Sequence, residues 1–325
     1  MLQDRFGRIH DYLRISLTDA CNFRCTYCMP QDIHFMPHNR LMSVDEIEQI
    51  ATEFVKLGVN KIRLTGGEPL VRKDAKEIIK RLSRLPVTLT LTTNGLLLHE
   101  YIDDILQANI KSINVSIDSL KEDKFEIITR RNCLKNVIQN IHILLQHDIS
   151  VKLNIVCIKG FNDDEICDFV ALTKQLPLHV RFIEFMPFTG NDWSPDTVVS
   201  AETILHLVSE QFTFVKLKDE FNDTARKYKP LHHEGTFAII STITNPFCGG
   251  CNRLRLTADG KMKNCLFSKN ETDLLSALRS GDDFTTLIID NLYSKAKERG
   301  GQFSTSYQDL DALHIINRSM VNIGG

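Results

Sequence analysis

Short β-branched segments alternate with helix-length amphipathic segments from Tyr12 to about Met186, and this alternation constrains the fold more than any other feature. Strands joined in series by helices form a parallel sheet with right-handed crossovers. Ser43 and Glu46 form a capping box that opens the first helix, which runs to about Leu57. The expected strands are 13–17, 61–64, 88–92, 112–117, 151–156 and 180–185, and the other expected helices are 75–85, 99–108, 134–147 and 163–176.

This rhythm predicts the α/β class and, more narrowly, an open barrel. About six strand–helix units are fewer than the eight that close a β/α barrel, so we expect a partial (open) β/α barrel over residues 1–190. After Trp193 the rhythm changes, and we expect residues 191–325 to cover the open side. That region should contain a strand at 236–242, a hairpin at 254–266 and helices at 272–278 and 284–297, whereas 221–233 is polar and loop-like.

Composition excludes some classes of function. The 42% hydrophobic and 25% charged residues are ordinary for a globular protein. A net charge near −2 argues against nucleic acid as a partner, because such proteins present a basic surface. The sequence has no run approaching the roughly 18 apolar residues of a membrane span, and no apolar signal region near Met1. We therefore expect a cytoplasmic protein without a membrane partner.

Six of the nine cysteines form two triplets, Cys21/Cys25/Cys28 and Cys248/Cys251/Cys265. Grouped cysteines in a reducing compartment suggest metal binding rather than disulfides. Three thiolates can hold three irons of a [4Fe–4S] cluster and leave the fourth iron open for chemistry. A structural zinc site is the alternative, but it usually needs a fourth ligand. The candidates His232 and His233 lie at a distance in the sequence.

The first triplet has C-x3-C-x2-C spacing with Tyr27 just before its last cysteine, and it resembles the signature of the radical S-adenosylmethionine enzymes. Such enzymes bind S-adenosylmethionine on the open iron and cleave it with one electron. The segment from Gly66 to Pro69 follows a predicted strand and is similar to the segment that holds the methionine amino group in that superfamily. The resemblance implies that the S-adenosylmethionine contacts are Tyr27, Gly67, Ser116 and Met186.

The second triplet narrows the resemblance. The chain from about Phe6 to Gly325 resembles the GTP 3′,8-cyclase family of molybdenum cofactor biosynthesis. The resemblance is carried by Cys248, Cys251-Asn-Arg-Leu-Arg-Leu-Thr, Cys265 and the terminal Gly324-Gly325. In that family a 5′-deoxyadenosyl radical removes hydrogen from C3′ of GTP. The new carbon radical attacks C8 of guanine and gives (8S)-3′,8-cyclo-7,8-dihydroguanosine 5′-triphosphate. The second cluster binds the guanine edge, and the double-glycine tail reaches the active site.

The resemblance also implies the residues that act on GTP. The implied GTP contacts are Arg14, Arg63, Thr92, Lys152, Arg253, Leu254 and Arg255, with a weaker match at Lys61 and Arg181. The implied catalytic residues are Arg253, Arg255, Gly324 and Gly325. Arginine suits phosphate because its planar fork donates hydrogen bonds in pairs. Arg253 and Arg255 alternate on a predicted strand, so they should face the same side, towards the cavity.

Two [4Fe–4S] clusters and S-adenosylmethionine are thus the expected cofactors of an oxygen-sensitive lyase. The expected partners are GTP, an electron donor and, downstream, a cyclic pyranopterin monophosphate synthase, with the chain a monomer or homodimer. Two alternatives stay open at this point. One is a peptide-modifying radical S-adenosylmethionine enzyme with an auxiliary cluster, and the other is a non-catalytic iron–sulfur redox protein.

Overall fold

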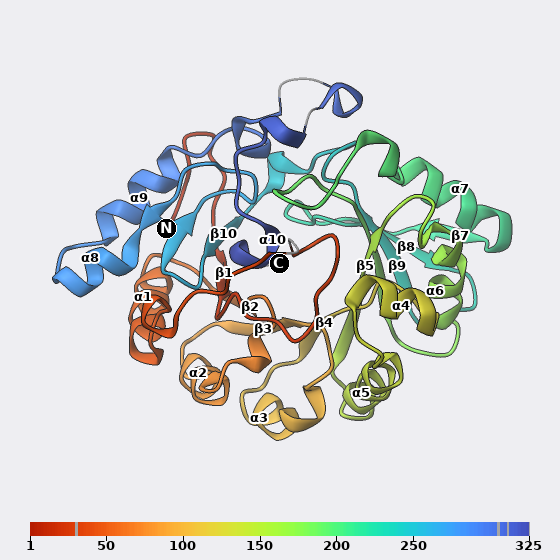
Figure 1. The fold of residues 1–325 in the computed structure, drawn as a ribbon, viewed down its shortest axis with the longest axis horizontal. Helices are drawn as coiled ribbons and strands as arrows, with labels where there is room; N and C mark the ends of the chain where they lie inside the picture. The colour runs from red at the N-terminus through yellow and green to blue at the C-terminus, as the bar shows by residue number, and fades with distance from the viewer. Residues whose placement is uncertain (30–31, 304–305, 311, 325) are drawn as a thin grey trace.

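The computed structural model describes residues 1–29, 32–303, 306–310 and 312–324 (Figure 1). Its strands belong to one twelve-stranded sheet in the order β12-β11-β10-β1-β2-β3-β4-β5-β6-β9-β8-β7. These strands are β1 (Tyr12–Ser16), β2 (Lys61–Thr65), β3 (Thr88–Thr93), β4 (Ser112–Ser116), β5 (Ser150–Cys157), β6 (His179–Glu184), β7 (Phe214–Lys216), β8 (Arg226–Pro230), β9 (Thr236–Ile240), β10 (Arg253–Leu256), β11 (Lys261–Lys263) and β12 (Thr272–Asp273).

The strands β1 to β6 lie side by side in chain order and pair in parallel. The C-terminal strands extend this sheet at both edges. β10 pairs in parallel with β1 and is followed by antiparallel β11 and β12, while β9 pairs in parallel with β6 and is followed by antiparallel β8 and β7. The α/β class is confirmed, and the regions before and after residue 190 share one hydrogen-bonded sheet.

Figure 1 shows helices along the outer side of the strands, as crossover connections require. The α-helices are α1 (Val44–Lys56), α2 (Ala75–Leu82), α3 (Ile102–Gln107), α4 (Glu122–Thr129), α5 (Leu134–Gln146), α6 (Ile166–Leu172), α7 (Ala201–Gln211), α8 (Leu274–Ser280), α9 (Thr285–Tyr293) and α10 (Met320–Ile323). The 3-10 helices are η1 (His38–Arg40), η2 (Pro69–Val71), η3 (Leu98–Glu100), η4 (Asp163–Glu165), η5 (Pro195–Thr197), η6 (Cys248–Gly250), η7 (Arg299–Gly301), η8 (Tyr307–Asp309) and η9 (Ala312–His314). None of the helices described here is long and apolar enough to cross a membrane.

The capping box is confirmed, because Ser43 Oγ accepts a hydrogen bond from the Glu46 amide and the Glu46 carboxylate accepts one from the Ser43 amide. Two expected helices of the C-terminal region have different bounds in the structure, one displaced along the chain and one shortened. The one expected at 272–278 begins at Leu274, because Asp273 caps the Ser276 amide at 2.8 Å and the two residues before Leu274 form β12. The one expected at 284–297 ends at Tyr293.

The expectation that 221–233 is a loop is wrong for residues 226–230, which form β8. Tyr228 is buried in this strand and stacks on Phe237 of β9 with ring centroids 5.1 Å apart. Lys227 and Lys229 alternate with Tyr228 and the buried Pro230. Buried and more exposed residues thus alternate as in a strand, but this pattern is missed when only hydrophobic residues are counted, because most residues here are charged.

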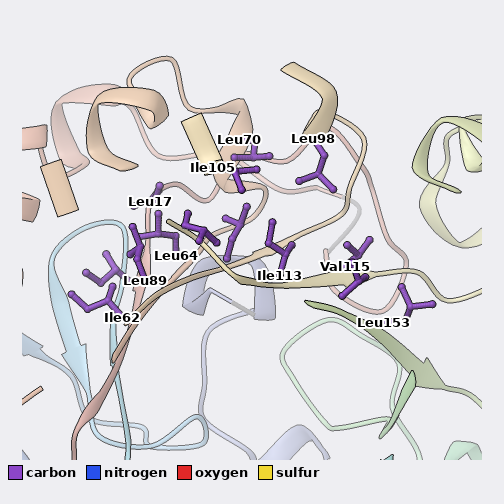
Figure 2. Packing of buried hydrophobic residues seen from close by; sticks show 14 of the residues in the cluster. Leu17, Ile62, Leu64, Leu70, Leu89, Leu98, Ile105, Ile113, Val115 and Leu153 are labelled. Atoms are coloured by element: carbon purple, nitrogen blue, oxygen red, sulfur yellow. The ribbon is translucent and has the colours of Figure 1, made fainter. Parts of the chain in front are cut away.

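Alternate residues of the parallel strands separate an apolar core from a polar face. Figure 2 shows Ile62 and Leu64 of β2 with Leu89 of β3 in one buried cluster, to which Ile105 of α3 also belongs. Arg63, between them, belongs to the opposite face, where it lines a cavity. The same separation places Arg14 on the cavity side. The core therefore holds rigid strands whose other faces present polar side chains to a site.

Candidate active site

A cavity of about 410 Å³ lies on the polar face of the strands and extends to the segments around the second cysteine triplet. Its lining is unusually cationic. The positively charged residues are Arg14, Lys61, Arg63, Lys152, Arg181, Arg253, Arg255 and Arg299. The sequence-predicted basic residues therefore converge on one space, although they come from several strands.

The pKa values of some of these cationic side chains are lowered, because the groups are buried and repel one another. Burial, together with the neighbouring Arg63 and Arg253, lowers the pKa of Arg14 to about 10. Burial and the charges of Arg181 and Arg63 lower the pKa of Lys152 to about 8. Each group thus loses part of its preference for the charged form, and an anion between them would restore it. The cavity is electrostatically suited to a polyanion.

Tyr12 lies among these cations and was not singled out from the sequence. Its hydroxyl accepts a hydrogen bond from Arg63 Nε at 2.5 Å, and Lys61 Nζ lies 4.8 Å from its ring centroid. Burial opposes ionisation of this phenol, but Arg63, Arg14 and Lys61 outweigh burial and lower its pKa to about 7. Tyr12 therefore orients and partly neutralises the cations in the absence of substrate.

The second cysteine triplet lines the same cavity. Cys248 lies in η6, Cys251 lies two residues before the start of β10, and Cys265 follows β11. Burial raises the pKa of the Cys248 thiol, and the negative charges of Cys265 and Cys251 raise it further, which shows that the three sulfurs are near one another. For Cys251, burial is outweighed by Arg253 and Lys295, and its pKa falls to about 6. At least one thiolate is therefore favoured without metal.

The first triplet forms a compact loop that follows β1. The Cys28 and Met29 amides donate to the Cys25 carbonyl at 3.1 and 3.0 Å. Burial raises the pKa of Cys28 to about 12, and the charge of Cys21 contributes. Burial also raises the pKa of Cys25 well above its usual range, with further contributions from Asp118, Cys28 and Cys21. The three thiols are thus close to one another, and each cysteine is only partly exposed.

These donor sets fit iron–sulfur clusters. Each triplet consists of soft sulfur ligands whose negative charges repel one another, and cluster irons would remove that repulsion. In the described part of the chain, no group of three or more His, Cys, Asp or Glu side chains is placed to hold a single metal ion. In a cluster each thiolate binds a different iron, so the sulfurs lie further apart than around one ion.

The glycines of the segment after β2 pack against the loop of the first triplet. A Cβ on Gly67 would lie 2.5 Å from the carbonyl oxygens of Asp19 and Ala20, and one on Gly66 would lie 2.7 Å from that of Thr18. The Gly67 amide donates to the Thr18 carbonyl at 2.7 Å. The glycines therefore permit close approach of two chain segments, in addition to any approach of ligand.

Glu68 anchors the same segment. It is fully buried, and its carboxylate accepts hydrogen bonds from Thr93 Oγ1 at 2.8 Å and from the Asn94 amide at 2.7 Å. Burial raises its pKa to about 7, although these hydrogen bonds oppose the shift. Asn94 Nδ2 in turn lies 3.9 Å from Cys21 Sγ. Glu68 thus links the ends of β2 and β3 to the first cysteine.

The other residues matched to S-adenosylmethionine lie around this loop. The Tyr27 hydroxyl donates to Asp118 Oδ2 at 2.8 Å, and Tyr27 and Met186 pack against the same apolar cluster. Ser116 is the last residue of β4 and pairs in register with Asn154 of β5. Met186 also lines the cavity, so it lies between the first triplet's surroundings and the cationic site.

The C-terminal tail enters the molecule rather than leaving it, and Figure 1 shows α10 within the curve of the strands. Arg255 Nη1 donates to the Gly324 carbonyl at 2.5 Å. Gly324 has φ 86°, and a Cβ there would lie 2.8 Å from both Ser16 Cβ and Thr65 Oγ1. Only glycine fits this conformation and this space without strain. Gly325 lies outside the described residues.

The side chains of two residues expected to contact GTP, Leu254 and Thr92, do not line the cavity. The Leu254 side chain is fully buried in the main apolar core, because it alternates with Arg253 and Arg255 along β10. Its side chain therefore faces away from the cavity. Thr92 is not among the residues that line the cavity, but its hydroxyl accepts a hydrogen bond from Arg63 Nη1 at 3.4 Å.

Several lining residues were missed from the sequence. Asn114 and Asn154 carry a usable signal, since each is a polar residue between buried apolar neighbours of a strand. The segment between β7 and β8 carries no such signal. It nevertheless lines the cavity through Glu220, Asn222, Asp223 and Thr224, three of which lie in the region expected only to be a polar loop.

Two family models match most of the chain. A family model described as the Radical SAM superfamily matches residues 15–173, and one described as Molybdenum Cofactor Synthesis C matches residues 178–300. A solved structure of Streptococcus suis SuiB bound to S-adenosylmethionine has a TM-score of 0.63, with 12% identity over 95% of this chain and 72% of that chain. At that identity the likeness shows the fold alone.

Curated relatives are much more similar in sequence. The mitochondrial GTP 3′,8-cyclase of Arabidopsis thaliana is 44% identical, covering 100% of this chain and 84% of the relative. The GTP 3′,8-cyclase of Peptoclostridium acidaminophilum is 43% identical, covering 100% of this chain and 98% of the relative. The chain spans about half of Molybdenum cofactor biosynthesis protein 1 of Drosophila melanogaster, at 52% of its length and 45% identity. The chain therefore belongs to the GTP 3′,8-cyclase family.

Proposed function

We propose that this protein is a radical S-adenosylmethionine GTP 3′,8-cyclase. It converts GTP to (8S)-3′,8-cyclo-7,8-dihydroguanosine 5′-triphosphate, the first step of molybdenum cofactor biosynthesis. The observation that carries the proposal is the joint lining of one cavity by the second cysteine triplet and by the cationic side chains. A nucleotide triphosphate has an anionic tail for the cations and a base for the cluster.

The cations bind and orient the triphosphate. Charge-assisted hydrogen bonds contribute roughly 1.5–3 kcal/mol each. Arg63 is held in place by the Tyr12 hydroxyl and by the Leu91 carbonyl at 2.7 Å, and Arg181 by Asn154 Oδ1 at 2.5 Å. Because their protein partners fix these side chains, the phosphates meet an ordered surface, and less entropy is lost on binding.

The two triplets hold the two [4Fe–4S] clusters. Cys21, Cys25 and Cys28 form the first site, and Cys248, Cys251 and Cys265 the second. When bound, the clusters supply the electron that cleaves S-adenosylmethionine and an open iron that binds the guanine edge. The chain keeps both sites shielded, because the cysteines are at most partly exposed and the first loop packs on the segment from Gly66 to Glu68.

S-adenosylmethionine binds between the first triplet and the cavity. Its proposed contacts are Tyr27, Gly67, Ser116 and Met186, and Asp118 accepts a hydrogen bond from the Tyr27 hydroxyl at 2.8 Å. Arg255 links the GTP site to the tail through the Gly324 carbonyl. The tail thereby restricts the space around the reacting ribose.

The remaining expectations complete the proposal. The strand–helix units β1 to β6 form an open barrel over residues 1–190, and residues 191–325 complete its edges and cover its open side. The protein acts in the cytoplasm as a monomer or homodimer and receives electrons from a reductase or small electron carrier. A cyclic pyranopterin monophosphate synthase consumes its product.

One anaerobic incubation separates this function from its alternatives. The chain is reconstituted with iron and sulfide and incubated with dithionite, S-adenosylmethionine and GTP, and products are read by mass spectrometry. A GTP cyclase yields 5′-deoxyadenosine together with the cyclised nucleotide. A peptide-modifying enzyme would leave GTP unchanged, and a redox protein would leave S-adenosylmethionine intact.

Variants of the two triplets assign their roles in the same assay. Cys25→Ser should abolish 5′-deoxyadenosine formation. Cys265→Ser should still cleave S-adenosylmethionine but lose the cyclised nucleotide, because the first site remains complete. Normal cyclisation by Cys265→Ser would contradict the assignment of the second triplet to the substrate.

A further inference from the structure

Lys295 is a buried lysine next to the second cysteine triplet, and the proposed function gives it no role. Its side chain is 2% exposed. Its ammonium lies 3.6 Å from Cys251 Sγ and 3.2 Å from the Arg253 carbonyl. Among the carboxylates that the structure describes, none lies within ion-pair distance of it. Its only anionic contact in that set is thus a sulfur of the triplet.

The fold holds Lys295 in this position from two sides. It follows the end of α9, where Asn264 Nδ2 donates to the Asn291 carbonyl at 2.7 Å, and Asn264 immediately precedes Cys265. On the other side Arg8 donates to the Ala296 carbonyl at 3.0 Å and to the Cys248 carbonyl at 2.9 Å.

The backbone on both sides of Lys295 is therefore held near Cys248 and Cys265, while the Lys295 side chain contacts Cys251. The contact between Lys295 and Cys251 is therefore fixed by the surrounding fold. A surface lysine that folded back by chance would lack these hydrogen bonds to its neighbouring backbone.

The energetics of burial point to the same partner. The Lys295 side chain is 2% exposed, and its ammonium lies 3.6 Å from Cys251 Sγ, so this buried cation faces a ligand sulfur. Placing a cation in such a site is costly unless it is paired. The lysine and the thiolates therefore stabilise each other.

We propose that Lys295 is the fixed counter-charge of the second [4Fe–4S] cluster, where it stabilises the thiolate of Cys251 and raises the cluster's reduction potential. The inference rests on the proposed function, because it requires a cluster at that triplet. One-electron reduction adds negative charge to the cluster. A nearby ammonium that donates towards a ligand sulfur therefore favours the reduced form over the oxidised form. Lys295 is a positioning residue that acts through Cys251.

The test is a redox titration with dithionite, followed by electron paramagnetic resonance, on the full chain carrying Cys21→Ala, Cys25→Ala and Cys28→Ala, so that the signal reports the second cluster. Lys295→Met should shift the midpoint potential to a more negative value and speed iron loss to a chelator several-fold. Lys295→Arg should stay near the parent in both. Lys297→Met is the matched control, because it removes the same charge from the same segment at an exposed side chain and should change neither.

Each outcome decides the matter. Loss of the second cluster from Lys295→Met but not from Lys295→Arg would also support the inference, because arginine keeps the positive charge and methionine does not. An unchanged potential in a Lys295→Met protein that retains its cluster would overturn it, as would equal cluster loss in the Met and Arg variants. If the parent protein bound no cluster at this triplet, the proposed function would fail instead, and iron and sulfide analysis shows which case holds.

Discussion

At the scale of single residues, uncharged side chains position the cationic side chains of the site through hydrogen bonds. Tyr12 fixes Arg63, and Asn154 fixes Arg181, before any phosphate arrives. These partners lie on the same strands as the cations or on neighbouring ones, so strand register sets the arrangement. Substrate affinity should therefore depend on residues that carry no positive charge.

Tyr12→Phe tests this dependence. The substitution keeps the ring beneath Lys61 but removes the hydroxyl that accepts a hydrogen bond from Arg63. A hydrogen bond to a charged group contributes roughly 1.5–3 kcal/mol, so the KM for GTP should rise about ten-fold or more. Steady-state kinetics measures it, with Tyr293→Phe on the exposed face of α9 as the control. An unchanged KM would mean that Tyr12 does not orient Arg63.

Lys152 should make the reaction sensitive to alkaline pH. Burial and the nearby Arg181 and Arg63 lower its pKa to about 8, so the charged form prevails below that pH and is lost above it. The value of kcat/KM for GTP, which reports the free enzyme, should therefore fall as pH rises through about 8. In Lys152→Arg this fall should move to higher pH, because arginine stays protonated. The same profile in both proteins would exclude Lys152 as its origin.

At the scale of elements, loops far apart in the sequence complete the cavity. The segment between β7 and β8 lines it through Glu220 and Asp223, and it rests directly on the loop of the second triplet. A Cβ on Gly250 would lie only 2.0 Å from the Phe221 carbonyl oxygen. The glycine in the cysteine motif is therefore a docking point for the other loop.

Gly250→Ala should separate these two loops. Overpacking typically costs about 1–3 kcal/mol, so we expect a lower melting temperature and a higher KM for GTP. Gly249→Ala is the matched control, since a Cβ there would meet nothing within 4 Å. Calorimetry and kinetics on both variants provide the comparison. The same melting temperature and the same KM for GTP in both variants would show that the contact between the loops does not affect stability or substrate binding.

The tail is the other element that enters the site. Deleting Gly324 and Gly325 removes the carbonyl that Arg255 contacts but leaves the sheet and both triplets in place. Cyclised product should fall at least ten-fold, while the iron content and 5′-deoxyadenosine formation persist. The ratio of the two products, read by mass spectrometry, is the measurement. A truncated chain with the parent's ratio would make the tail a passive end.

At the scale of the whole molecule, much of the site was accessible from sequence because its signals are local. The spacing of the first cysteine triplet, the segment from Gly66 to Pro69 and the alternation of Arg253 with Arg255 each lie within a few residues. What could not be predicted depends on contacts between distant segments. Examples are the docking of Phe221 on Gly250, the buried contact of Lys295 with Cys251, and β8, whose alternation is hidden by lysines.

The central claim is that this cavity positions the ribose of GTP for hydrogen removal at C3′. The most direct test is an anaerobic single-turnover incubation of the reconstituted protein with S-adenosylmethionine, dithionite and GTP deuterated at C3′. We predict one deuterium in the 5′-deoxyadenosine and an equal amount of cyclised nucleotide. Cleavage of S-adenosylmethionine that leaves the deuterium on unreacted GTP would contradict the account.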